Sequence, residues 1–182
     1  DILLVIDEAY GEFADHLGEP LFDLVGRGDT VILRTFSKAY GLAGMRVGWG
    51  LFPENIAGEV RKVMNPNNIS VAGQTAAETA LSDQAYMRET CAITARLRDG
   101  FSHRLRKAGY YIAESFTNFT LIRFCDAGAA QQADASLRIE GVVARAQGGA
   151  GLPDCLRITV GTAEDLDLAS SLLEHWAKGG KA

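Results

Sequence analysis

Residues 31–48 read VILRTFSKAYGLAGMRVG, a short apolar run followed by a lysine and then by a glycine-rich segment. Val31–Leu33 is apolar on both faces, which is typical of a buried strand in a parallel sheet. Lys38 follows soon after this strand, although a lysine is rarely buried unless it has a partner or a task. The stretch therefore predicts a lysine with a chemical role near the end of a strand.

The side chains around Lys38 suit a ligand that carries phosphate. Thr35 and Ser37 lie three and one positions before Lys38, and Arg46 lies eight positions after it. Hydroxyls donate hydrogen bonds to phosphate oxygens, and a guanidinium adds a charge-assisted pair. An amine in such a place can lose its proton and form a Schiff base. An exposed loop with a solvated lysine and arginine fits the same spacing equally well, so this cluster alone leaves both interpretations open.

A second cluster follows the apolar run Ile2–Ile6, which also reads as a buried strand. Asp7 ends this run, at the place where open α/β sheets usually bind ligands, and Tyr10 lies three residues further on. A carboxylate can keep a pyridine nitrogen protonated, and a phenol can bond the oxygen of such a ring. Taken alone, this cluster is better explained by an aspartate that caps a helix beside a half-buried tyrosine.

The remaining segments alternate between strand and helix patterns, which predicts an α/β fold. Further strands are expected at 47–51, 110–112, 120–124, 142–144 and 156–160, and helices at 53–64, 71–81, 83–108, 127–137 and from 162 onward. Thr162 and Asp165 have the spacing of a capping box at the start of the last helix. We place a domain boundary inside the long helix, which separates residues 1–85 from a small domain at 86–182.

Composition and charge argue against several kinds of partner. Lys and Arg total 18 and Asp and Glu total 23, so the net charge of −5 leaves no basic excess for binding nucleic acid. The basic stretch 96–107 is expected to be a solvated helix face. No apolar run approaches the roughly 20 residues that span a bilayer, so no membrane partner is expected. Cys91, Cys125 and Cys155 lack metal spacing, which predicts no metal site and a reduced, cytoplasmic setting.

Taken together, the two clusters resemble those of the fold type I aminotransferases that depend on pyridoxal phosphate. The matching residues are Asp7-x-x-Tyr10, Thr35-x-Ser37-Lys38 and Arg46, and the likeness continues through Asn118-Phe119 and LRITVG at 156–161. Within that class the chain looks most like the histidinol-phosphate aminotransferase family, on SKAYGLAGMRVG at 37–48, VAR at 143–145 and GLP at 151–153. The resemblance implies the end of a large domain with a mostly parallel sheet, followed by a small α/β domain.

The resemblance also implies a role for each matching residue, with pyridoxal 5′-phosphate as the cofactor. Lys38 resembles the Schiff-base lysine, which also moves a proton, while Asp7 and Tyr10 resemble the partners of the ring nitrogen and the ring oxygen. The ligands of the cofactor phosphate are expected to be Thr35, Ser37 and Arg46.

Three residues of the second domain match substrate-binding positions of the family. Arg157 is similar to the arginine that grips a substrate carboxylate. Where the amino donor carries phosphate instead, Arg157 and Arg145 are expected to hold that phosphate together. Asn118 belongs to the matching Asn-Phe segment and is expected to lie near the substrate.

The implied activity is amino transfer from a primary amine, expected to be histidinol phosphate, to a 2-oxo acid, expected to be 2-oxoglutarate, in histidine biosynthesis. A threonine-phosphate decarboxylase, an aromatic amino-acid aminotransferase and a non-catalytic remnant are the alternatives. The family implies a homodimer. It also has an earlier half that supplies a glycine-rich turn and an aromatic residue for the cofactor. The chain is therefore expected to be a fragment, the C-terminal half, which is inactive by itself.

Overall fold

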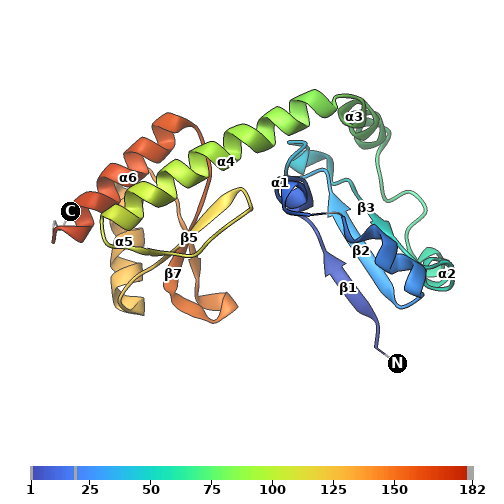
Figure 1. Ribbon diagram of the computed structural model, residues 1–182, viewed down its shortest axis with the longest axis horizontal. Helices are drawn as coiled ribbons and strands as arrows, with labels where there is room; N and C mark the ends of the chain where they lie inside the picture. The colour runs from blue at the N-terminus through green and yellow to red at the C-terminus, as the bar shows by residue number, and fades with distance from the viewer. Residues whose placement is uncertain (1, 19, 180–182) are drawn as a thin grey trace. The chain divides into compact units, whose positions relative to one another are not determined.

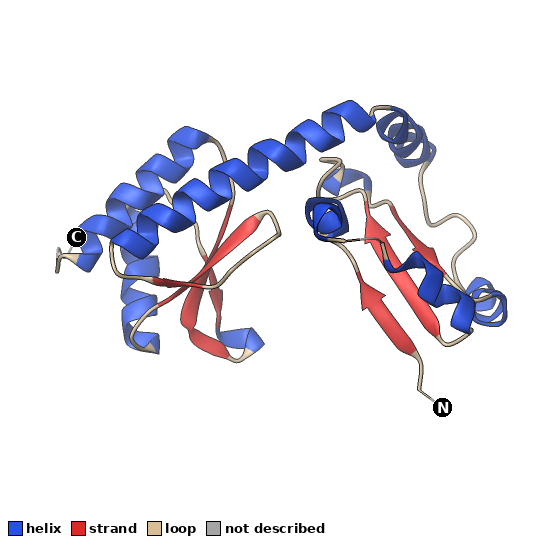
Figure 2. Ribbon diagram, in the orientation of Figure 1, coloured by secondary structure: helices blue, strands red, loops and turns tan. Residues whose placement is uncertain are grey.

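The computed structural model describes residues 2–18 and 20–179, which form two compact units that divide inside helix α4 (Gln84–Lys107), between Ala92 and Ile93 (Figure 1). The boundary expected from the sequence lies at residue 85 of the same helix. Both units combine strands and helices, so the predicted α/β class is confirmed (Figure 2). Among the described residues, no helix is both long and apolar enough to cross a membrane.

The first unit is built on a three-stranded sheet in the order β1-β2-β3. β1 (Leu4–Asp7) runs parallel to β2 (Thr30–Thr35), and β3 (Gly48–Leu51) runs antiparallel to β2 on its other side. The predicted burial of the second apolar run is confirmed, because Val31 and Ile32 are almost completely buried. Adjacent parallel strands end at the same edge of a sheet, so the segments that follow β1 and β2 leave from one edge.

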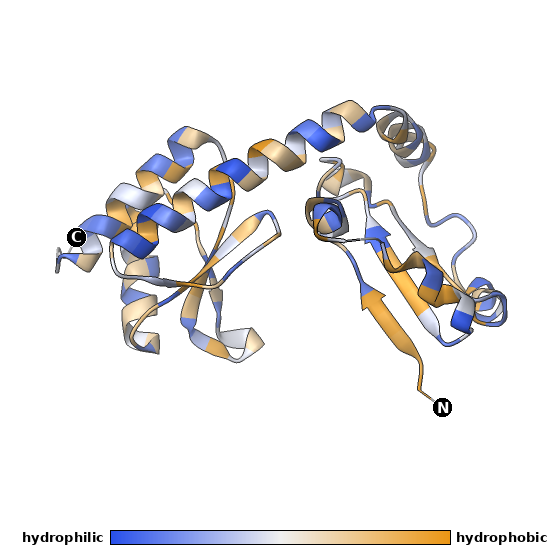
Figure 3. Ribbon diagram, in the orientation of Figure 1, coloured by the Kyte–Doolittle hydropathy of each residue, from blue (hydrophilic) through white to orange (hydrophobic). Residues whose placement is uncertain are grey.

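β1 is less buried than its sequence predicts. The strand begins at Leu4, and the side chains of Leu4 and Val5 are exposed. Within the described ranges β1 pairs with β2 alone, so no further strand shields it from solvent. The prediction of a strand buried over 2–6 is therefore wrong for the described residues, although the strand itself is present and strongly hydrophobic (Figure 3).

Short helical segments connect β1 to β2, and longer helices follow β3. The connection contains α1 (Gly11–Ala14), η1 (Asp15–Leu17) and η2 (Leu21–Arg27), none of which the sequence predicts. α2 (Glu54–Val63) and α3 (Val71–Ser82) occupy the expected ranges to within a residue. Ser70 caps α3, because its hydroxyl accepts a hydrogen bond from the backbone N–H of Gly73.

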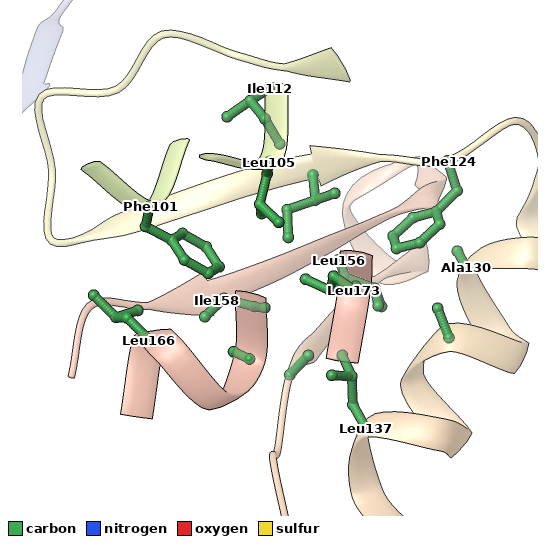
Figure 4. Packing of buried hydrophobic residues seen from close by; sticks show 14 residues of the cluster. Phe101, Leu105, Ile112, Phe124, Ala130, Leu137, Leu156, Ile158, Leu166 and Leu173 are labelled. Carbon is green, nitrogen blue, oxygen red and sulfur yellow. The ribbon is translucent and has the colours of Figure 1, made fainter. Parts of the chain in front are cut away.

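The second unit folds around a four-stranded antiparallel sheet in the order β4-β5-β7-β6. Its strands are β4 (Tyr111–Ile112), β5 (Phe119–Arg123), β6 (Arg145–Gln147) and β7 (Leu152–Thr159). α5 (Ala127–Ile139), α6 (Ala163–Ala177) and the end of α4 complete one hydrophobic core with this sheet (Figure 4). The predicted capping box is confirmed, since Thr162 and Asp165 exchange both of its hydrogen bonds.

Two strands of this sheet differ in position from the sequence prediction. The expected strand at 142–144 is wrong, because the strand lies at Arg145–Gln147 and Ala144 is buried in the core just before it. β7 starts at Leu152 rather than at residue 156, and it contains Pro153. The pairing of β7 with β5 begins at Cys155, beyond the proline, so the missing N–H of Pro153 costs no bond to β5.

A buried guanidinium ties the β1–β2 connection to the sheet. The side chain of Arg34, on β2, is 7% exposed and donates to Glu8 at 2.9 Å and to Asp15 at 2.8 Å. Glu12 lies 3.6 Å from the same guanidinium, and its own side chain is 3% exposed. Burial raises the pKa of Glu12, because desolvation disfavours its charged form more than Arg34 favours it. Three acidic residues of the connection thus converge on one arginine of the central strand.

Arg34→Met is expected to lower the free energy of unfolding by about 3 kcal/mol, because buried carboxylates lose their counter-charge. Arg27→Met is the matched control. Arg27 is exposed and lies 3.8 Å from Asp29, so its loss should change stability by less than about 0.5 kcal/mol. Urea unfolding of the purified variants measures both values. Equal stability of the two variants would show that the Arg34 cluster does not hold the connection in place.

Tyr110 gives a test that depends on pH. Its hydroxyl donates to the carbonyl of Leu173 on α6 at 2.8 Å, and burial raises the pKa of Tyr110 to about 12. Tyr110→Phe is expected to cost about 1 kcal/mol at neutral pH. The unfolded phenol ionises near pH 10, below the folded one, so the wild-type advantage should shrink as the pH rises from about 10 toward 12. Denaturant unfolding of both proteins at pH 8 and pH 11 checks this, and a constant difference would contradict it.

Candidate functional site

The predicted residues of the first unit gather where β1 and β2 end. Asp7 is the last residue of β1, and Lys38 lies three residues beyond Thr35, the last residue of β2. The backbone N–H of Glu8 donates to the carbonyl of Leu33 at 2.8 Å, which continues the parallel pairing past Asp7. Asp7 Oδ1 accepts from the backbone N–H of Ala9 at 3.0 Å, so the carboxylate is oriented and keeps its second oxygen for a ligand.

Lys38 carries a half-buried amine that lies near Tyr10. Its Nζ atom is 5.5 Å from the centroid of the Tyr10 ring, and in the described parts of the chain no carboxylate forms an ion pair with it. Phe13, Ala39 and Met87 pack into a small cluster that Tyr10 borders. The packing holds the phenol beside the lysine, and no ion pair with another described residue ties up the lysine amine.

A tight turn brings the three predicted phosphate ligands together. Thr35 Oγ1 accepts from the backbone N–H of Ser37 at 3.1 Å, and Arg46 Nη1 donates to Ser37 Oγ at 3.4 Å and to the carbonyl of Ala43 at 2.9 Å. Arg46 has a φ of 56°, the one positive value among the described non-glycine residues. A left-handed arginine costs about 1 kcal/mol or more. Such strain is common where a side chain is held for a ligand.

The chemistry of this donor set fits a phosphate. Ser37 contributes a hydroxyl, and Arg46 contributes a cation that bonds no carboxylate within the residues that the structure describes. Both side chains are at least partly exposed, so an anion can reach them. Charge-assisted bonds to a guanidinium are among the stronger polar contacts in proteins.

The second unit places two arginines directly opposite each other. Arg145 on β6 pairs with Arg157 on β7, so both side chains leave the same face of the sheet. Arg157 Nε is buried without a hydrogen-bond partner, and in the described residues neither arginine forms an ion pair. Like charges in this arrangement repel each other. The pair is therefore suited to hold an anion between its guanidinium groups.

Asn118 lies just before β5, and its backbone is fixed. Its carbonyl accepts from the backbone N–H of Val160 at 2.8 Å, and its side chain is half-buried. The six predicted residues of the first unit thus cluster at one sheet edge, and Arg145 and Arg157 of the second unit lie together. Asn118 lies two residues along the chain from Thr120, whose side chain faces the core.

The sequence prediction missed the role of Arg98. The stretch 96–107 is expected to be solvated, which is wrong for Arg98, whose side chain is 5% exposed. Its Nη1 donates to the carbonyl of Thr117 at 3.1 Å. The signal was in the spacing, because Arg98, Phe101 and Leu105 fall on one helical stripe and the other two are core residues.

Comparisons with known proteins identify the family of the chain. The model of the class I and II aminotransferase family matches residues 1–172. Histidinol-phosphate aminotransferases of Paramagnetospirillum magneticum and Rhodospirillum centenum are 43% and 39% identical to the chain, over 97% and 98% of its length and 50% of their own. The histidinol-phosphate aminotransferase of Sinorhizobium meliloti, solved with pyridoxal-5′-phosphate, superposes with a TM-score of 0.89 at 32% identity, over 97% of this chain and 49% of that one. The chain thus spans about half the length of these relatives.

Arg145→Gln is expected to raise the stability of the second unit by about 0.5 kcal/mol in anion-free buffer, because it removes a cross-strand repulsion. Added phosphate should then stabilise the wild type more than the variant. Arg123→Gln is the control, since Arg123 on the same sheet already pairs with Asp154 at 3.0 Å. Thermal unfolding with and without phosphate measures the effect. A phosphate response that Arg123→Gln reduces as much as Arg145→Gln would point to general charge screening.

Proposed function

Because this chain belongs to the class I and II aminotransferase family, we propose that it supplies the lysine-bearing part of a site for pyridoxal 5′-phosphate. The observation that carries the proposal is the placement of Asp7 at the end of β1 and of Lys38 just beyond the end of the adjacent parallel strand β2. An aminotransferase needs an amine and a carboxylate on one rigid frame, and the pairing of β1 with β2 provides that frame.

Each residue of this cluster has a defined task in the proposal. Lys38 holds the cofactor through its amine, Asp7 faces the ring nitrogen, and Tyr10 donates to the ring oxygen. The phosphate ligands are Thr35, Ser37 and Arg46. When bound, the cofactor supplies an electron sink for the negative charge that develops at the substrate α-carbon.

The chain's own side chains account for proton movement in this scheme. Lys38 Nζ would take the proton from the substrate α-carbon and deliver it to C4′ of the cofactor, a task open to an amine with no carboxylate partner among the described residues. Asp7 places a carboxylate next to the ring nitrogen, which a protonated ring nitrogen requires. Its bond from the N–H of Ala9 keeps the carboxylate in one orientation.

We infer that the amino donor carries phosphate and is histidinol phosphate, that 2-oxoglutarate accepts the amino group, and that the reaction belongs to histidine biosynthesis. The paired Arg145 and Arg157 support this donor, because two cations that form no ion pair within the described ranges suit a doubly charged group. The names of the relatives support it as well. A homodimer in the cytoplasm is the proposed form of the whole enzyme.

Treatment of the complete, cofactor-loaded enzyme with borohydride is expected to leave the reduced cofactor attached to Lys38. Lys38→Ala should abolish the attachment and the turnover, because the other described lysine of the first unit, Lys62, lies on α2 and not at the ends of β1 and β2. Lys62→Ala is the control, since Lys62 is exposed on α2 and pairs with Glu59. Peptide mapping by mass spectrometry gives the attachment site. Label on Lys62 or Lys107 in the wild type would sink the assignment.

A further inference from the structure

Phe119 is an aromatic residue on the face of the second sheet that does not line the core. Thr120 and Ile122 of β5 are fully buried, so alternation along the strand directs Phe119 and Leu121 to the opposite face. Arg157 pairs with Leu121 and therefore lies on this same face, diagonal to Phe119. The guanidinium carbon of Arg157 is 4.9 Å from the centroid of the Phe119 ring. The two side chains form a cation–π contact.

We propose that Phe119 is a positioning residue that fixes the guanidinium plane of Arg157 for the anionic group of the substrate, an inference that rests on the proposed function. The ring covers one face of the planar guanidinium and leaves its N–H edge available for hydrogen bonds. Arg157 Nε finds no hydrogen-bond partner among the described residues, so no carbonyl or carboxylate fixes the plane from that side. A side chain oriented beforehand loses less rotamer freedom when the anion binds.

The backbone around Phe119 is fixed by local hydrogen bonds. Ser115 Oγ donates to the carbonyl of Phe119 at 2.8 Å, and the N–H of Phe119 donates to Thr117 Oγ1 at 3.3 Å. The hydroxyls of Ser115 and Thr117 also lie 2.9 Å apart. The start of β5 is therefore held by two hydroxyls of the segment that precedes it, and this segment fixes the backbone that carries the ring.

Arg98 anchors the same segment from α4. Its buried guanidinium donates to the carbonyl of Thr117 and to Asp99, and it lies 5.8 Å from the centroid of the Phe116 ring. A buried cation is tolerated when its donors are bonded, and here the bonds hold the turn that leads into β5. Arg98 thus acts on Arg157 through Phe119 and is a positioning residue as well.

The test uses the complete enzyme, with inorganic phosphate as the probe of the arginine pair. Phe119→Leu keeps an apolar side chain and removes the ring, so phosphate should bind about tenfold more weakly. The KM for the phosphate-bearing donor should rise by a similar factor, with kcat changed by less than about twofold. Phe119→Tyr keeps a ring and should restore both constants to near the wild-type values.

A spectroscopic readout separates positioning from general damage. The Nε–H resonance of Arg157, observed with ¹⁵N-labelled arginine, should move when the ring of Phe119 is lost, because ring currents act on nearby protons. Arg98→Lys keeps the charge but loses the fork that reaches Thr117, so phosphate should bind more weakly and the Thr117–Phe119 amides should exchange faster.

Tyr111→Leu is the matched control. The guanidinium carbon of Arg123 lies 6.0 Å from the centroid of the Tyr111 ring on β4. This second cation–π contact is on the same sheet but does not involve Arg145 or Arg157. Its loss should leave phosphate binding unchanged.

The outcomes also separate this inference from the proposed function. If Arg157→Gln weakens phosphate binding and Phe119→Leu does not, the positioning role is overturned while the anion site remains. If Arg157→Gln leaves phosphate binding unchanged, the arginine pair does not hold the anion, and both the phosphate-donor proposal and the inference fall. Weakened binding in Phe119→Leu, recovery in Phe119→Tyr and a shifted Arg157 resonance together support the role.

Discussion

The geometry at the lysine depends on one buried charge, the guanidinium of Arg34. Arg34 belongs to β2, the strand that leads to Thr35 and Lys38, while its partners Glu8 and Asp15 belong to the segment that follows β1. Hydrogen bonds to a charged, desolvated group have narrow geometry, so the two segments cannot slide past each other without losing them. The ion cluster therefore sets the register in which an acidic residue and an amine leave the same sheet edge.

The second unit follows the same physical logic with different residues. Its core is hydrophobic and continuous, whereas the opposite face of its sheet carries Arg145 and Arg157, which form no ion pair with any residue that the structure describes. Arg98 is buried, and its donors stabilise a turn rather than a ligand. Arg157 is half-buried, and its buried Nε has no hydrogen-bond partner in the part of the chain that the structure describes. Arg98 therefore stabilises the fold, whereas the charge of Arg157 is not used in an ion pair among the described residues.

Local signals predicted well where the determining contacts are close in sequence. The capping box at Thr162, the helices on either side of residue 65 and the apolar strand before Lys38 each follow from a few adjacent residues. Contacts between distant residues decided the rest. Burial of β1 depends on which strands flank it. The three residues of β6 are too few to show a strand period. Arg98 is buried because it donates to the carbonyl of Thr117, in a loop that is distant in sequence. For the site, sequence indicated the clusters, while the residue roles within them stay predictions.

Arg46 adopts a backbone conformation that glycine tolerates and arginine resists, and this has a consequence for anyone who redesigns the protein. A design procedure that minimises backbone strain at each position will prefer glycine at position 46, because glycine adopts this conformation without strain. The same change deletes the cation beside Ser37. Under the proposed function, thermal stability and binding of the cofactor phosphate therefore make opposite demands on position 46. Selection for thermal stability alone would favour variants that lack the proposed phosphate ligand. Thermal stability and anion binding must therefore be screened together.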